Sequence, residues 1–164
     1  MNRNSLRWFL TVLTLLFAIG VPLLADDDTT SRQSLKGIKS IAVVIGPLDS
    51  DELTEGLTVD QLQTDVELRL RKAGVSVVTS GPTVVLLVDT NFLKNANTGL
   101  YAYYCEVKVL QLVTAPNATS LVAPTWSKSI LIMVGSANLS SSVRGRVGDL
   151  VDKFLNAYLS VNPK

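Results

Sequence analysis

Apolar and polar residues follow two different periodicities along this chain, and the change from one to the other marks its elements. The segment 38–45 contains the uninterrupted apolar run Ile41 to Ile45 and ends at Gly46 and Pro47. A short β-branched run closed by a turn signal is typical of an interior strand. Four more strands are predicted where apolar residues alternate or cluster between turn-rich segments, over 75–79, 83–93, 100–113 and 121–134.

Helical spacing of apolar residues appears first after Thr58. Gln61 follows Thr58 by three residues, which is the pattern of a capping box, and Gly74 lies where a C′ glycine ends a helix. Between them one apolar stripe recurs every third or fourth residue. The stripe comprises Leu62, Val66, Leu70 and Ala73. A helix is therefore predicted from Thr58 to about residue 73.

A second helix is predicted over 138–160, where apolar residues recur at helical spacing up to Leu159. Gly145 and Gly148 lie inside it, and each lowers helix propensity by roughly 1 kcal/mol relative to Ala. Glycines in this position indicate a close approach of the helix to the sheet or to a neighbouring element.

The predicted order of elements is βαββββα, which is an α+β fold. The first strand, first helix and second strand indicate a parallel crossover, and the three long strands that follow indicate an antiparallel meander. Each helix has one apolar stripe, so both are expected on the same face of the sheet. The prediction is a two-layer sandwich with a five-stranded mixed sheet and two helices on one face.

The N-terminus has the pattern of a secretory signal peptide. Arg3 and Arg7 precede an apolar run from Trp8 to Val21, and Ala25 lies just before a polar stretch. We expect cleavage after Ala25, with an uncleaved N-terminal anchor as the alternative. The predicted organisation is a signal peptide over 1–25, a flexible leader over 26–37 and a single α/β domain over 38–164. The expected location is periplasmic or secreted, with no stable membrane span after cleavage.

Composition excludes several kinds of chemistry. The 164 residues include no His and one Cys, with 15 basic and 14 acidic side chains. His-dependent nucleophiles, His-ligated metals, cysteine zinc sites and internal disulfides are therefore excluded. A net charge of +1 gives no electrostatic basis for nucleic-acid binding. No cofactor, metal or catalytic residue is predicted, and Cys105 is expected to be a buried small apolar residue.

The acidic residues support hydrolytic chemistry or calcium binding only weakly. Four acids over 49–55 lack the alternation of an EF-hand loop and are expected to be a solvated loop. Asp89 and Glu106 lie on strands, and a carboxylate-dependent hydrolase would need two such groups about 5–10 Å apart in a cleft. A Ser–Lys dyad from Ser127 and Lys128 is disfavoured because successive strand residues face opposite sides.

Two groups of side chains are candidates for binding. The predicted fifth strand is apolar on both faces at Ile130, Leu131, Ile132 and Met133, so either the final helix and loops cover it or it meets another chain. Aromatic residues on adjacent strands are the second group, and they offer a stacking platform for a small ligand or glycan, with cross-strand packing as the alternative. This platform comprises Tyr101, Tyr104 and Trp126.

Residues 56–62, 65–75, 99–103 and 154–163 resemble a small family of exported bacterial proteins of unknown function. The order of elements is similar to that of envelope-associated α/β domains. Examples are the N-terminal domain of the Tol-system propeller protein and small outer-membrane lipoprotein domains. The resemblance implies a domain that uses its surface for protein contacts, and it assigns no functional residue.

The sequence thus favours an exported, non-catalytic domain with a protein-interaction or structural role in the envelope. Its expected partner is an envelope protein or a second copy of the chain. A ligand-binding or glycan-binding module is the alternative, and a carboxylate-dependent hydrolase is a further one.

Overall fold

The structure is a computed structural model that describes residues 27–48, 56–81 and 83–163. The described chain contains the helices α2, α4 and α5, the short 3₁₀ helix η1 and five strands. In chain order they are α2 Thr29–Gln33, β1 Ser40–Ile45, α4 Val59–Lys72, β2 Ser76–Val77, β3 Val84–Asn95, β4 Leu100–Thr114, β5 Ser120–Gly135, η1 Ser136–Asn138 and α5 Leu139–Val161.

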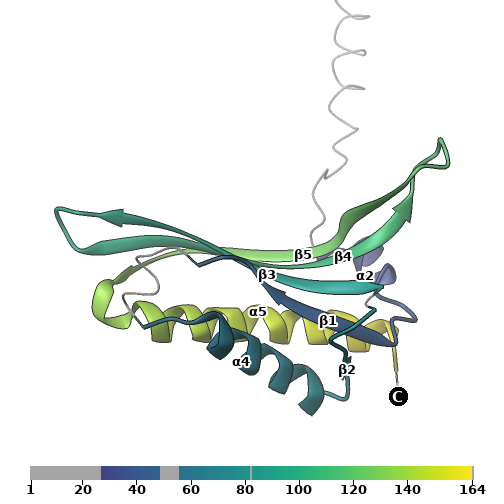
Figure 1. Cartoon of the computed structure of the whole chain (residues 1–164), viewed down its shortest axis with the longest axis horizontal. Coiled ribbons are helices and arrows are strands. Elements are labelled where there is room, and N and C mark those ends of the chain that lie inside the picture. The colour runs from purple at the N-terminus through teal and green to yellow at the C-terminus, as the bar shows by residue number, and fades with distance from the viewer. Residues whose placement is uncertain (1–26, 49–55, 82, 164) are drawn as a thin grey trace, which may run out of the picture.

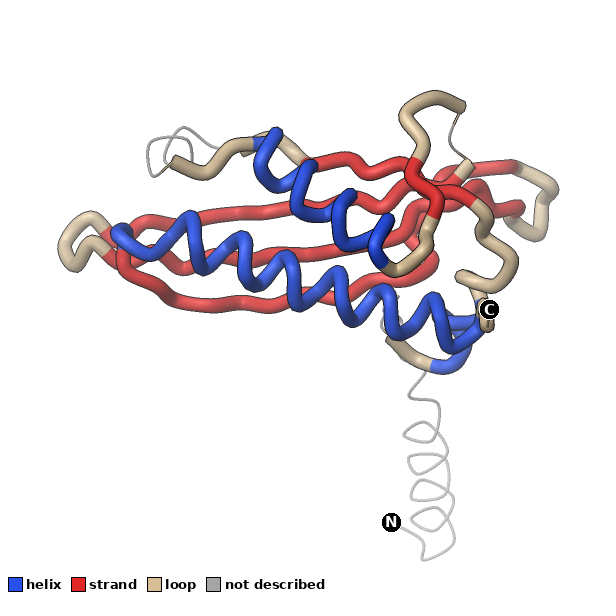
Figure 2. Tube along the Cα trace, turned by 90° about the horizontal axis from the view of Figure 1, so that it is seen from below, coloured by secondary structure: helices blue, strands red, loops and turns tan. Residues whose placement is uncertain are grey.

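The five strands form one mixed sheet in the order β2-β1-β3-β4-β5. β1 pairs in parallel with β2 and β3, whereas β3, β4 and β5 pair antiparallel as a meander. Helices α4 and α5 lie on the same face of this sheet (Figure 1). Seen from the helix side, the two helices lie next to each other over the strands, with α5 close to the strand direction and α4 inclined to it (Figure 2). The predicted α+β fold, with a mixed sheet and two helices on one face, is confirmed.

Helix α4 begins and ends where the sequence predicted. The Thr58 side chain accepts a hydrogen bond from the Gln61 backbone at 3.2 Å, which satisfies one of the first unpaired amides of the helix. Gly74 has a φ of 85°, a left-handed conformation that glycine adopts without a Cβ penalty. The buried side of the helix is the predicted stripe Leu62, Val66 and Leu70.

The core lies between the sheet and the two helices. Odd-numbered residues of β4 from 101 to 109 point into it and are fully buried. Cys105 is one of them, as predicted. On β5, Trp126 packs edge-on against Phe154 of α5, with the ring centroids 5.5 Å apart. Alternation along β4 thus defines a covered face, which faces the helices, and an opposite face.

Residues 27–37, which the sequence predicts to be a flexible leader, contain a short helix and a buried leucine. This segment contains α2, which is capped by Asp28 and Ser31 and packs against α5 and β5. Leu35 is fully buried in the core. The Asp27 carboxylate joins the segment to the sheet, because it accepts hydrogen bonds from both Arg32 and the Trp126 indole. A segment without apolar periodicity is ordered here by tertiary contacts.

Two predicted features lie outside the described residues. They are the signal peptide over 1–25 and the acidic loop over 49–55. Within the ranges that are described, no helix combines the length and hydropathy needed to cross a membrane.

Candidate functional site

The sheet face opposite α4 and α5 carries no described helix, and we call it the open face (Figure 1). The even-numbered side chains of β4 lie on it, because their odd-numbered neighbours fill the core. The strand register places specific residues of β3 and β5 beside them. Tyr104, for example, lies between Asn91 and Leu131. The chemistry of the open face divides into two parts.

The first part is an apolar patch toward the β3–β4 turn. Ala102 lies between Leu93 on β3 and Met133 on β5. Leu131 lies on the same face of β5, two residues before Met133. Leu93, Leu131 and Met133 are exposed by 74%, 71% and 68% of their surface. Leu93, Ala102, Met133 and Leu100 also line a shallow hollow of about 380 Å³. Contiguous exposed side chains of this size mark contact sites more often than scattered ones do.

The second part is a charged cluster in the middle of the open face. Asp89 and Glu106 are direct cross-strand neighbours. Lys108 bridges them, with its Nζ 2.9 Å from Glu106 Oε2 and 3.4 Å from Asp89 Oδ2. The hydrogen bond to Glu106 raises the pKa of Lys108, and the desolvation that opposes it is the smaller effect. The ammonium therefore stays charged at neutral pH and holds the two carboxylates together.

This cluster has the parts of a hydrolytic site but not their usual arrangement. Two carboxylates lie side by side, yet both accept hydrogen bonds from one ammonium and both lie on a sheet surface. Ser127 is the cross-strand neighbour of Lys108, whereas Lys128 pairs with Val107 on the covered face. Ser127 and Lys128 therefore point to opposite sides. A charged Lys108 is also a poor general base for a serine hydroxyl.

The four residues of the predicted interaction surface divide between the two faces. Ile130 and Ile132 are half-buried and pack against the core, so α5 and the sheet cover them. Leu131 and Met133 lie on the open face. The first alternative considered from the sequence, cover by the final helix, thus applies to the helix side of the strand, and contact with another chain stays a prediction for Leu131 and Met133.

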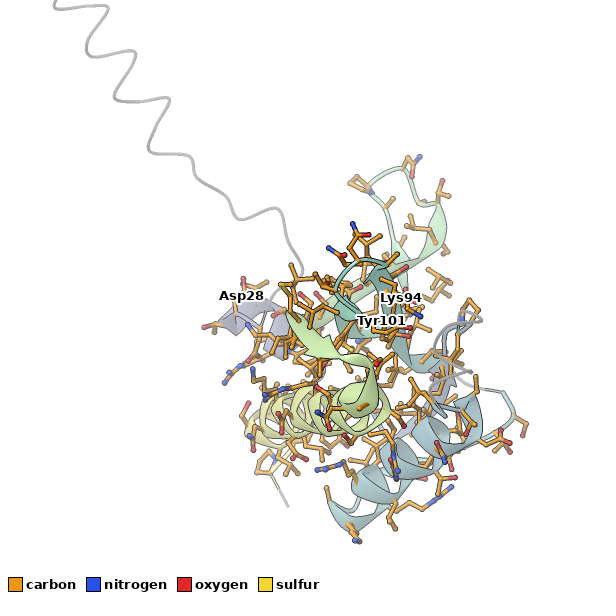
Figure 3. The ribbon with its side chains drawn as sticks, turned by 90° about the vertical axis from the view of Figure 1, so that its left-hand side faces the viewer. Asp28, Lys94 and Tyr101 are labelled. Carbon is orange, nitrogen blue, oxygen red and sulfur yellow. The ribbon has the colours of Figure 1, made fainter. Side chains whose placement is uncertain are left out.

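The aromatic platform expected from Tyr101, Tyr104 and Trp126 is not assembled. Tyr101 and Trp126 are fully buried on the covered face, whereas Tyr104 is half-buried on the open one. Lys94 Nζ lies 5.1 Å from the centre of the Tyr101 ring, and Figure 3 shows the two side by side. The expectation of a joint stacking surface is corrected, because Tyr101 and Tyr104 are three residues apart on β4 and the alternation of the strand places them on opposite faces.

A second hollow, of about 570 Å³, lies between α4 and α5. The arginines along it are each paired across the two helices. Arg144 donates to Asp65 at 2.7 and 3.1 Å, and Arg69 donates to Asp152 at 2.8 and 3.0 Å. Arg144 forms a fork-shaped pair through Nε and Nη2, whereas Arg69 reaches both Asp152 oxygens from Nη1 alone, and each pair connects the two helices. We assign this hollow to helix packing.

Leu93 and the bridge from Lys108 to Asp89 and Glu106 were not predicted as site features. Leu93 is exposed because its register on β3 places it on the open face beside Ala102, where no described helix covers it. Cross-strand pairing depends on register, which a single strand does not display. In the part of the chain that the structure describes, no group of three or more acids or cysteines is placed to hold a metal ion.

Comparison with known proteins finds no matching family model and no matching curated protein. Among solved structures, the fold is similar to a minor lipoprotein from Acinetobacter baumannii, with 13% identity, a TM-score of 0.44, and coverage of 77% of this chain and 95% of that chain. The rare lipoprotein B from Shewanella oneidensis matches with 16% identity, a TM-score of 0.43, and coverage of 75% and 96%. The PelC dodecamer from Paraburkholderia phytofirmans matches with 14% identity, a TM-score of 0.43, and coverage of 71% and 86%. Likenesses at this level assign no function to the chain.

Proposed function

We propose that this chain is an exported, non-catalytic domain of the bacterial envelope that binds another protein through the open face of its sheet. The main observation in support is the apolar patch. Its side chains Leu93, Leu131 and Met133 are each exposed by about 70% and lie on β3 and β5, on either side of Ala102 of β4. Burying such side chains against a partner gains roughly 25 cal/mol for each Å² removed from water. The signal-peptide pattern over 1–25 supports export.

The charged cluster supplies selectivity to the same surface. A partner that covers the open face must also accommodate the group formed by Asp89, Glu106 and Lys108. An ion pair that is covered without polar partners loses hydration, so a purely apolar partner is disfavoured. We therefore expect a partner with an apolar centre and polar groups that match this cluster. The two alternative functions lack a specific observation in their favour, since the aromatic residues are separated and the carboxylates are tied to Lys108.

Site-specific photo-crosslinking in the native host tests the proposal. A benzophenone side chain at Leu93 is expected to give a covalent adduct with a partner protein. Met133→Lys in the same chain should reduce that adduct, because it places a charge in the patch. Leu68 is the matched control, since it is a leucine on α4 with 48% of its surface exposed on the opposite side of the molecule. Equal adduct yields at Leu93 and Leu68, or none at Leu93, would overturn the proposal.

A further inference from the structure

The outer edge of β5 is the unpaired edge of a long strand. The sheet order ends with β5, which spans Ser120–Gly135 and pairs with β4 on one side only. The opposite end of the sheet is β2, which has two residues and offers little edge to pair with. An edge strand presents free backbone N–H and C=O groups, and a long apolar one is a template for another strand.

The direction of each backbone group along β5 follows from the hydrogen bonds of its neighbours. The Val88 carbonyl accepts from the Gly46 amide at 2.7 Å, so the backbone of Val88 faces β1. Hydrogen-bonded and non-hydrogen-bonded pairs alternate in antiparallel sheets, so Val107, the partner of Val88, faces β5 and bonds to Lys128. Even-numbered residues from 128 to 134 therefore face β4. The bond from the Ser136 amide to the Gly99 carbonyl agrees with this alternation.

The backbone groups of Ser129, Leu131 and Met133 consequently point away from the sheet. Among the described residues, none forms a hydrogen bond with these outward groups. The first half of β5 is different, because Ser34 next to α2 donates to the Thr125 carbonyl at 3.3 Å. The uncovered stretch is thus confined to the second half of the strand.

The features of β5 that protect an edge strand lie before residue 129. Pro124 and a register irregularity lie there, and Lys128 follows just before the uncovered stretch. Residues 129–134 read Ser-Ile-Leu-Ile-Met-Val and contain no charge, proline or glycine. This composition is typical of segments that pair with an identical segment.

We propose that the edge of β5 pairs antiparallel with the same edge of a second copy, about a two-fold axis at Leu131. In this register Ser129 lies opposite the second copy's Met133, and their outward backbone groups meet. Leu131 lies opposite its own equivalent. Three hydrogen-bonded pairs supply on the order of six hydrogen bonds across the interface. The result is one continuous sheet across both copies, with a short β2 at each end.

The occupant is a second copy because the edge is complementary to itself. Ile130 lies opposite the second copy's Ile132 on the covered face, and Leu131 meets its equivalent on the open face. Lys128 lies opposite Val134, so no two like charges are brought together. Residues 129–134 carry no charge that would select a different protein. The two-fold symmetry also closes the assembly, since both long edges are used. This inference goes beyond the proposed function, because it concerns the sheet edge and not its open face.

Light scattering after size exclusion, on the purified protein over about 1–100 µM, tests the inference. The unmodified chain should be a dimer. Leu131→Pro removes the outward N–H at an edge position that proline tolerates, and it should weaken dimerisation by about tenfold or more. Leu131→Ala keeps the N–H and should remain dimeric. If Leu131→Pro misfolds, Leu131→Lys serves in its place, because it puts two like charges at the axis and should give a monomer.

Leu93→Lys separates the two proposals. It introduces the same charge on the open face, away from the β5 edge, and should leave the dimer intact. A monomeric unmodified protein, or a dimer that survives both Leu131→Pro and Leu131→Lys, would overturn the edge pairing. Loss of the dimer in Leu93→Lys would also overturn it, because the open face would then hold the copies together. None of these results decides the crosslinking test for a different partner, so the two proposals fail separately.

Discussion

The two glycines within α5 give a matched pair of substitutions with opposite surroundings. A Cβ placed at Gly148 would lie 2.6 Å from Arg69 Nη2 and 2.8 Å from Arg69 Cζ, whereas a Cβ at Gly145 meets nothing within 4 Å. The guanidinium of Arg69 therefore lies against the backbone of α5 at Gly148. From this position it reaches Asp152 with bonds of 2.8 and 3.0 Å.

The expected free-energy changes follow from this geometry. Replacement of an interior helix glycine by Ala gains about 0.5–1 kcal/mol. Gly145→Ala should show this full gain. Gly148→Ala should gain the same amount from the helix, but it must displace Arg69 and loosen an exposed ion pair worth about 0.2–1 kcal/mol. The net change in the free energy of unfolding for Gly148→Ala should therefore be smaller than that for Gly145→Ala, between about −0.5 and +0.8 kcal/mol.

Urea denaturation of the two variants and the unmodified protein measures the difference. The decisive control is the Arg69→Ala background, in which no guanidinium lies over the helix. There Gly148→Ala should recover the gain of about 0.5–1 kcal/mol, so a double-mutant cycle gives the coupling directly. If Gly148→Ala stabilises the unmodified chain as much as Gly145→Ala does, the argument from close approach is refuted.

Three further substitutions test individual contacts by urea denaturation. Asp27→Asn should cost about 1 kcal/mol at pH 7, because Asp27 bonds Arg32 and that bond lowers its pKa from 3.8. A carboxylate whose pKa is lowered by folding stabilises the fold at pH values above its pKa in the unfolded chain. The difference in stability between Asp27→Asn and the unmodified protein should therefore vanish as the pH falls well below 4. A difference that is unchanged at pH 3 contradicts this. Lys108→Met leaves two adjacent carboxylates without their ammonium and should cost about 0.5–1 kcal/mol at pH 7. That cost should shrink as the salt concentration is raised, and a salt-independent cost would speak against repulsion. Thr58→Ala should lower the free energy of unfolding by about 1 kcal/mol, because the helix cap is lost. Thr58→Ser keeps a capping hydroxyl and should retain most of the stability. Equal losses in both variants would exclude the cap as the cause.

Local patterns in the sequence were sufficient for the order of elements from β1 to α5 and for the placement of α4 and α5 on one face of the sheet, but not for α2. Thr58 and Gly74 mark the ends of α4 because capping depends on residues within one turn. Alternation along β4 placed Cys105 in the core for the same reason, since the faces of a strand follow from its own residues. Gly148 indicated a close approach that the structure shows, whereas Gly145 lies in open space.

Contacts between distant segments decided the rest. The segment 27–37 has no periodicity, and it is ordered because Trp126, nearly one hundred residues later, donates to Asp27. The separation of Tyr101 from Tyr104, and the bridge from Lys108 to Asp89, depend on strand direction and register. Register is set by the whole sheet and its turns, so no single segment encodes it. The sequence by itself therefore determined which residues are apolar and where elements begin. The tertiary structure alone decided which side chains meet on the open face and which edge of the sheet is left unpaired.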